Sequence, residues 1–303
     1  MGDILSKGTL FPAELSNQVI SMVKGKSAIA ALANAEPIAF NGNEYFTFTL
    51  DKEADIVAEN GAKTKGGATI TPVTIKPIKI EYGARISDEF MYASEEKRID
   101  MLAPLADGFS KKFARALDIM SIHGKNPRTK QLAEGTIGNN YFDYVVEQVV
   151  TQDEQTTADD QVEAAIALVE GSDGEVSGMA MAPAFKSDLA AMKGTDGHKI
   201  YPELAWGKAP GSINGLPVTT NNTVAFDSST DKALVGDFEN MFKWGYAKDM
   251  WLKVIEYGNP DNDQDLGDLQ GHNQVYVRAE AYLGWGILDA NSFAFIKSAE
   301  ISG

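Results

Sequence analysis

The chain has 303 residues, with 27 basic and 43 acidic side chains and a formal net charge of −16. So much negative charge repels a phosphate backbone, which argues against a protein that reads a nucleic-acid sequence. Hydrophobic residues make up 44% and charged residues 23%, so the composition excludes disordered and collagen-like chains and allows a sizeable core.

The first 36 residues are polar sequence around one short apolar pattern. Apolar residues follow Pro12 at helical spacing, namely Leu15, Val19, Ile20 and Val23. We expect a short helix there, in an arm that docks these side chains elsewhere. Gly25, Lys26 and Ser27 resemble the end of a phosphate-binding loop, but that motif needs a glycine five positions earlier, where Ile20 stands, so we predict no nucleotide site.

From Glu44 the hydrophobic period changes to two. Phe46, Phe48 and Leu50 alternate with more polar residues, which predicts a half-buried strand. A second strand is expected over residues 73–82, with a bulge or bend at Pro77 where the apolar phase changes. The connection over residues 51–71 is small, charged and glycine-rich, so it favours a hairpin that reaches a neighbouring subunit; a surface loop without fixed structure is the alternative.

The strongest helical period lies between Ser94 and Gly124. Its apolar stripe consists of Leu102, Leu105, Phe109, Phe113, Ala116, Leu117 and Met120. His123 and Gly124 are typical of a helix end, and Pro104 should lie in the first turn or kink the helix. A long helix with one apolar face, entered from strand-rich sequence, predicts a spine that joins two parts of the molecule.

Mixed structure follows the spine. Residues 158–170 form an amphipathic pattern that ends at Gly171, and a buried strand should lead into a second helix over residues 183–192. The last long strand pair is expected within residues 274–298. No internal repeat or low-complexity tract appears.

Motifs for catalysis, cofactors and metals are missing. The absence of cysteine excludes disulfides and thiolate chemistry, and the histidines, His123, His198 and His272, lack metal-ligand spacing. We expect each histidine at the surface or at a helix end. Asp261, Asp263 and Asp265 resemble the start of a calcium loop, but glycine and glutamate are not at its later positions, so a solvated acidic loop is expected. The four tryptophans should be core or interface anchors, and no apolar run is long enough to span a bilayer.

Several segments, in order, resemble the major capsid proteins of tailed bacteriophages, which share the Hong Kong ninety-seven fold. The resemblance covers nearly the whole chain. It is carried by LFPAELSNQVISMVKGKSAIAALA, EADIVAENGAKTKGGATITPVTIKPIKIEYGARISDEFM, GMAMAPAFKSDLAAMKGTDGHKI, INGLPVTTNN, ALVGDF and NQVYVRAEAYLGWGILDANSFAFIK. Each segment is a loose pattern, and their order and spacing together are the specific signal.

The resemblance implies an α+β capsid fold of four parts. These are an N-terminal arm (residues 1–36), an extended β-hairpin loop (37–80), a peripheral domain with the spine helix (81–124 and 241–303) and an inserted axial domain (125–240). It also implies a structural protein without enzymatic activity, cofactor or metal, which assembles in the host cytoplasm into pentamers and hexamers of an icosahedral virion.

The implied partners are other copies of the chain, a portal, and packaged double-stranded DNA bound without sequence specificity; no membrane is involved. Because Met1 lies a few residues from the arm, scaffolding is expected to come from a separate protein or to be unnecessary, unless the chain was trimmed. Two other functions remain open: a bacterial nanocompartment shell of the same fold, and a soluble cytoplasmic α+β enzyme.

Some members of this family weld their shells by joining an extended-loop lysine to an asparagine of a neighbouring subunit. The resemblance places the asparagine at Asn273 and the glutamate base at Glu280, seven residues later, and the loop offers Lys63 and Lys65. A glutamate in a dry interface could take the lysine proton and free the amine for attack. In the alternative interpretation, Asn273 caps a loop, Glu280 pairs with Arg278 or another base, and the lysines are solvated.

Overall fold

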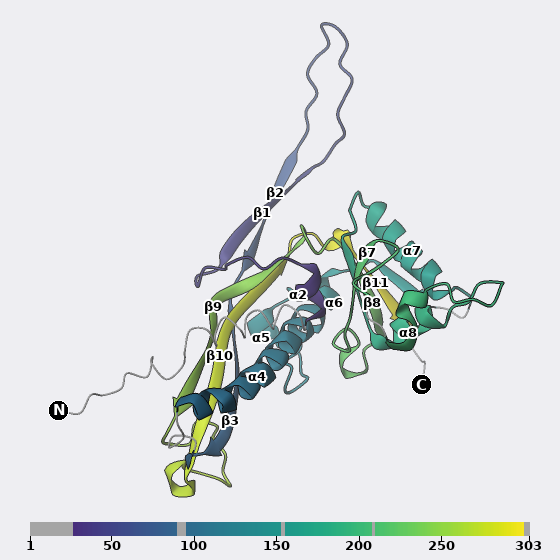
Figure 1. The fold of residues 1–303 in the computed structure, drawn as a ribbon. Helices are drawn as coiled ribbons and strands as arrows, with labels where there is room; N and C mark the ends of the chain where they lie inside the picture. Colours follow the sequence, from purple (N-terminus) through teal and green to yellow (C-terminus); the bar gives the residue numbers. More distant parts are fainter. Residues whose placement is uncertain (1–26, 90–94, 153–154, 208–209, 300–303) are drawn as a thin grey trace.

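A computed structural model describes residues 27–89, 95–152, 155–207 and 210–299, with side chains described outside 95–103 and 249–250. The helix expected after Pro12 lies outside these residues. Figure 1 shows an elongated molecule in which a long helix runs between a twisted sheet and a second, more compact region, while a thin hairpin projects from one end.

The spine helix, α4, spans Glu95–His123, as its period predicts. The described part of the apolar stripe is buried at Phe109, Phe113, Ala116, Leu117 and Met120. Gly124 follows with φ +63° and donates its N–H to the Met120 carbonyl, which ends the helix as expected. Of the two expectations for Pro104, its placement in the first turn was wrong, because Pro104 is the tenth residue of the helix; a kink there stays a prediction.

The middle of α4, from Leu105 to Phe113, packs on a three-stranded antiparallel sheet. Its strand order is β3 (Ile78–Ser87), β10 (Gln274–Ile287) and β9 (Phe242–Ile255). Phe109 and Phe113 form one core cluster with the buried side chains of β10, which are Val275, Val277, Ala279 and Ala281. The long central strand β10 therefore provides the surface that holds the spine helix.

The hairpin consists of β1 (Asn43–Leu50) and β2 (Ala68–Ile75), which pair with each other in a two-stranded sheet. The single strand expected over residues 73–82 is divided between β2 and β3, with the break at Lys76 and Pro77. Proline has no N–H for a ladder hydrogen bond, so pairing with one strand stops there and pairing with another begins. In Figure 1 the hairpin extends away from both sheets.

The described end of the arm contacts the compact region, the spine and the three-stranded sheet. The short helix α2 (Ala28–Leu32) is capped by the Ser27 side chain, and the chain then pairs with β9, where Glu36 donates its N–H to the Trp244 carbonyl at 2.8 Å. A Cβ on Gly245 would lie 1.7 Å from the Glu36 carbonyl oxygen. Glycine at position 245 therefore lets the arm cross the strand at backbone distance.

The compact region is a six-stranded mixed sheet covered on both faces. Its strands, in spatial order, are β4 (Val149–Gln152), β11 (Phe293–Ser298), β8 (Asp231–Gly236), β5 (Gly178–Met181), β7 (Leu216–Thr220) and β6 (Ser212–Ile213). One face packs against α7 (Ala158–Glu170) and α8 (Pro183–Ala191), both as predicted. The other face packs in a common core with the end of α4 and with the short helices α5 (Glu134–Ile137) and α6 (Phe142–Val145).

The C-terminal strand crosses from one part of the molecule to the other. Residues 241–303 were assigned together to the peripheral domain, yet β9 and β10 lie in the three-stranded sheet and β11 lies between β4 and β8 in the larger sheet. The division into arm, loop, peripheral and axial parts stays a proposal. If it holds, β11 contributes to the axial core.

Candidate functional site

The projecting hairpin exposes an apolar face. Residues directly opposite in an antiparallel pair share one face, and the register sets Phe46 opposite Pro72, Phe48 opposite Ile70, and Leu50 opposite Ala68. The exposed fractions are 65% for Phe46, 69% for Phe48, 70% for Leu50 and 66% for Ile70. The prediction of a half-buried strand was therefore wrong for the subunit alone, because nothing in the described chain covers this face. We call these six residues the apolar ribbon face.

The candidate crosslink residues lie at different places on the molecule. Lys63 and Lys65 are exposed in the connection between β1 and β2, whereas Asn273 directly precedes β10. In Figure 1 the connection between β1 and β2 and the beginning of β10 lie at opposite ends of the molecule. Seven residues of strand separate Asn273 from Glu280, which is about 23 Å. One subunit therefore does not bring these groups together, and any bond among them needs neighbouring chains.

Glu280 is the buried member of this set. It is 4% exposed, and its carboxylate lies 2.9 Å from the Lys79 ammonium and 2.8 Å from the Arg278 guanidinium. The alternative in which Glu280 pairs with Arg278 is the arrangement in the subunit. Asn273 has φ +52°, ends the short 3₁₀ turn Gln270–His272, and accepts the Asp88 N–H through its carbonyl.

Four ionisable groups meet where the spine ends. His123 closes α4, Asp143 comes from α6, Asp231 begins β8 and Lys297 lies on β11. The His123 Nδ1 lies 2.7 Å from an Asp143 oxygen and 3.5 Å from an Asp231 oxygen, and the Lys297 ammonium lies 3.1 Å from Asp143 and 2.9 Å from Asp231. We call these four residues the junction quartet. The histidine is at a helix end as expected, but it is buried.

The geometry requires a charged histidine. The His123 Nε2 lies 3.0 Å from the Thr223 carbonyl, which only accepts hydrogen bonds, and Nδ1 faces a carboxylate, which also accepts. Burial lowers the pKa of His123, but Asp143, the Thr223 carbonyl and Asp231 together raise it above 6.5. With an imidazolium and an ammonium facing two carboxylates, the quartet is charge-balanced.

A divalent metal does not suit the junction quartet. His123, Asp143 and Asp231 are the one group in the described part of the chain whose ligand atoms lie close enough to hold an ion. The Lys297 ammonium contacts both carboxylates, however, and the 2.7 Å distance between Nδ1 and Asp143 fits a proton between them. Lysine and proton therefore supply the positive charge that a metal would bring.

The raised pKa of His123 predicts that stability falls toward alkaline pH. A group whose pKa is higher in the folded state stabilises the fold below its unfolded value, near 6.5, and loses that contribution as pH rises through the folded pKa. Urea denaturation between pH 5.5 and 9 should show the free energy of unfolding falling by up to about 1.4 kcal/mol per pH unit above pH 6.5.

The variant His123→Gln should remove this slope, whereas His198→Gln, at an exposed histidine, should retain it. A slope of the same size in His123→Gln would contradict the assignment. The change of stability at acid pH does not test His123, because Asp231 and Asp143 also titrate there. Burial and the Asp143 charge raise the pKa of Asp231. The charges of His123 and Lys297 outweigh burial and lower the pKa of Asp143.

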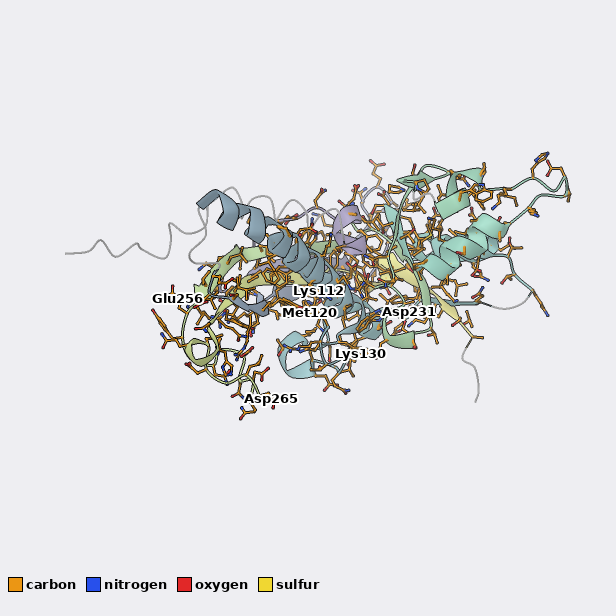
Figure 2. All side chains as sticks on the ribbon, turned by 60° about the horizontal axis from the view of Figure 1, so that its bottom comes forward. Lys112, Met120, Lys130, Asp231, Glu256 and Asp265 are labelled. Carbon is orange, nitrogen blue, oxygen red and sulfur yellow. The ribbon has the colours of Figure 1, made fainter. Side chains whose placement is uncertain are left out.

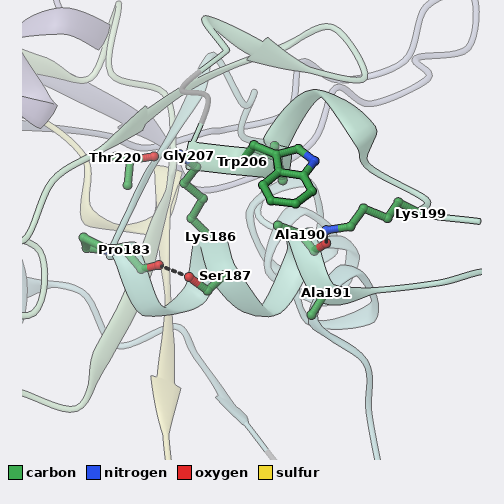
Figure 3. Close-up of a pocket in the computed structure, with 10 residues that line it drawn as sticks. Pro183, Lys186, Ser187, Ala190, Ala191, Lys199, Trp206, Gly207 and Thr220 are labelled. Carbon is green, nitrogen blue, oxygen red and sulfur yellow. Dashed lines mark hydrogen bonds between the residues drawn. The ribbon is translucent and has the colours of Figure 1, made fainter.

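An open cavity of about 370 Å³ lies beside α8 (Figure 3). Its lining includes Lys186, Lys199 and Trp206, and the Trp206 side chain is fully exposed. Trp244 and Trp285 are 2% exposed core residues, so the prediction of core anchors is confirmed for these two. The cavity offers two cations and an indole without a facing acid and base pair, which is not an arrangement for proton-transfer chemistry.

The acidic loop before β10 is held by one arginine. Arg85 donates to both carboxylate oxygens of Asp261, at 2.6 and 2.8 Å, and also to the Asn259 side chain and the Gly267 carbonyl. This pairing holds the pKa of Asp261 at about 2. The Asp263 side chain accepts hydrogen bonds from two backbone N–H groups of its own loop. The aspartates spaced as in a calcium loop therefore stabilise a turn.

Comparison with known proteins shows the family to which this chain belongs. The model of the phage capsid family matches residues 7–298. The chain belongs to the phage capsid family. It is thus a structural protein of a virion shell, and the apolar ribbon face and the junction quartet are features of a capsid protein.

Solved structures agree with the family assignment. A chain from a structure described as Mycobacterium phage Ogopogo is 33% identical, with a TM-score of 0.77 and coverage of 90% of this chain and 92% of that one. A chain from Gordonia phage Cozz is 26% identical, with a TM-score of 0.71 and coverage of 89% and 86%. A third, described as the capsid of native GTA particle computed with C5 symmetry, is 14% identical with a TM-score of 0.63, covers 90% of each chain, and supports the fold alone.

The fold predicted from the resemblance, α+β and similar to phage capsid proteins, is confirmed. A search of curated proteins gives no match. None of the helices in the described part of the chain is long and apolar enough to cross a membrane.

Proposed function

We propose that this capsid protein assembles into pentamers and hexamers of an icosahedral phage head that encloses double-stranded DNA. The observation that carries the proposal is the apolar ribbon face, which lies on a projecting hairpin and needs a cover. Burial of apolar surface contributes about 25 cal/mol per Å², so covering it by a neighbouring subunit favours assembly. A portal and a separate scaffolding protein are the further partners we propose, with assembly in the host cytoplasm.

The particle mass tests this function directly. Purified protein analysed by sedimentation and electron microscopy should give megadalton shells, or rings of pentamers and hexamers. Phe48→Asp should abolish assembly and leave the subunit folded, because this side chain is 69% exposed in the subunit. Thr49→Asp carries the same new charge on the opposite face of the ribbon and serves as control. A stable monomer or dimer of the unmodified protein would refute the proposal.

Residues 54–71 should be ordered mainly by neighbouring subunits. Ile56 is 97% exposed and Ile70 is 66% exposed, so the subunit alone offers little burial against an ordering entropy of about 1 to 2 kcal/mol per residue. Hydrogen exchange should be slow in this segment only in assembled particles. Equal protection from hydrogen exchange in subunit and particle would show that the hairpin is ordered without neighbouring subunits.

The isopeptide bond stays a proposal. The Lys63 or Lys65 amine would attack the side-chain amide carbon of Asn273, forming a C–N bond and releasing ammonia, while Glu280 takes the amine proton. In the subunit the Glu280 charge is neutralised by Lys79 and Arg278, so a base role requires that assembly alters this pairing. Denaturing electrophoresis should then show ladders that vanish in Glu280→Gln. A single band at 32.7 kDa would contradict the bond.

A further inference from the structure

Positive charge is concentrated in one segment of this acidic chain. Residues 111–130 hold six of the 27 basic residues but one of the 43 acidic residues. The basic residues are Lys111, Lys112, Arg115, Lys125, Arg128 and Lys130, and we call them the cationic strip. The acidic residue, Asp118, is fully buried. The net charge of −16 therefore conceals a strongly basic stretch.

The first three members lie on the open side of α4. Successive residues of a helix are turned by about 100°, so Lys111 and Arg115 are on the side away from buried Phe109 and Phe113, and Lys112 lies at the flank between the two sides. Lys111 and Lys112 are exposed and Arg115 is half-buried. The side of the helix that does not face the sheet is thus basic.

The loop over residues 221–229 connects the two halves of the strip. Arg115 donates to the Asn222 side chain, while the Lys125 and Lys130 ammonium groups lie 3.3 and 2.9 Å from Asp227. Figure 2 labels Lys112 on the spine and Lys130 on the loop beyond it. The strip therefore continues from the helix onto the loop that follows it.

Much of this charge is not neutralised within the subunit. Asp107 pairs with Lys111 at 2.5 Å, and Asp227 is shared by Lys125 and Lys130. Among the described residues, no ion pair involves Lys112, Arg115 or Arg128. About four positive charges remain for an external anion.

We infer that the cationic strip is the inward-facing surface that contacts the phosphodiester backbone of packaged DNA; this inference rests on the proposed function. The helical part from Lys112 to His123 and the loop beyond it extend over about 20 Å, which matches about six phosphates of one strand along a duplex axis. Lysine and arginine contacts to phosphates fix position and read no base. Side chains of a helix that lies along the phosphate backbone reach no base edges in a groove, so this binding is independent of sequence.

The test measures binding of a fluorescein-labelled 20-base-pair duplex to unassembled full-length subunits by anisotropy. With about four free charges, the logarithm of the association constant should fall with the logarithm of salt concentration with a slope of about −3 to −4. Lys111→Gln combined with Lys112→Gln removes the free charge of Lys112 and the charge of Lys111 that Asp107 offsets, so it should reduce the slope by about one to two and weaken binding at 50 mM salt by about ten- to a hundredfold. Lys76→Gln combined with Lys193→Gln removes the same charge from exposed lysines elsewhere and should leave the slope unchanged.

Three outcomes would overturn the inference. The first is an unchanged salt slope in the Lys111 and Lys112 double variant, with a thermal melting curve that shows it folded. The second is binding of a labelled 20-residue poly-glutamate peptide without binding of the duplex, which would indicate an acidic protein segment as the occupant. The third is equal duplex binding by intact shells and unassembled subunits, because an inward strip is inaccessible in a shell. Failure to form shells at all would instead refute the proposed function, and the anisotropy result does not depend on it.

Discussion

Replacing Lys297 by methionine is expected to lower the free energy of unfolding by about 3 kcal/mol. Methionine keeps most of the aliphatic stem and removes the ammonium that lies 3.1 Å from Asp143 and 2.9 Å from Asp231. Asp231 is 2% exposed, so its carboxylate would be left buried with less positive charge nearby. Breaking a buried ion pair on one side costs more than the pair contributes, because the remaining charge has lost its hydration.

Urea denaturation of unassembled subunits at pH 6 measures this effect, since His123 is charged there. Lys193→Met is the matched control, because Lys193 is exposed and its ammonium lies in no ion pair among the described residues. Lys297→Arg should retain most of the stability by retaining the charge. If Lys297→Met lost no more stability than Lys193→Met, the quartet would not hold α4, α6, β8 and β11 together.

Replacing Asp118 by alanine should cost at least about 3 kcal/mol, because one carboxylate organises five donors. Its oxygens accept hydrogen bonds from the Ser27, Thr223 and Asn221 side chains and from the backbone N–H groups of Ala28 and Ile29. Each buried donor left without an acceptor costs about 1 to 3 kcal/mol, and water can reach some of them after the change. Asp118 thus fastens the arm at α2 to the last third of the spine.

Asp118→Asn is the informative comparison. Asparagine has the same shape as aspartate and retains one acceptor oxygen, but it removes the buried charge. That charge is costly in this place: burial raises the pKa of Asp118, and the hydrogen bonds from Ser27, Thr223, Ala28 and Ile29 lower it by less. We expect Asp118→Asn to lose less stability than Asp118→Ala. Thermal unfolding gives the ranking, and hydrogen exchange of residues 28–33 should accelerate in the alanine variant. Unchanged exchange there would show that the arm is held by other contacts.

Elements whose stability is local could be predicted from the sequence. The 3.6-residue period located α4 and its buried stripe, with Gly124 as its end. The amphipathic pattern of residues 158–170, which ends at Gly171, predicted both ends of α7. The helix begins with a capping box, in which the side chains of Thr157 and Asp160 accept each other's backbone N–H. Periodicity and caps act over a few residues, so no knowledge of the rest of the chain is needed.

Whether an apolar face is covered depended on tertiary structure. The alternation in residues 44–50 correctly indicated a strand with one apolar side, but Phe48 on that side is 69% exposed. The same pattern would arise for a strand on a core and for a ribbon that awaits another chain. Alternation reports which residues share a face, and the packing partner comes from residues far away in sequence or from another subunit.

By itself, the sequence determined the three longest described helices, α4, α7 and α8, the strand phases and, through the order of its segments, the capsid family. Tertiary structure alone decided that β11 leaves the sheet of β9 and β10, and that His123 and Lys297 both contact Asp143 and Asp231. The contacts of this quartet join residues separated by up to 154 positions in the chain. Local propensities carry no record of such contacts, because they form only when separate core clusters pack together.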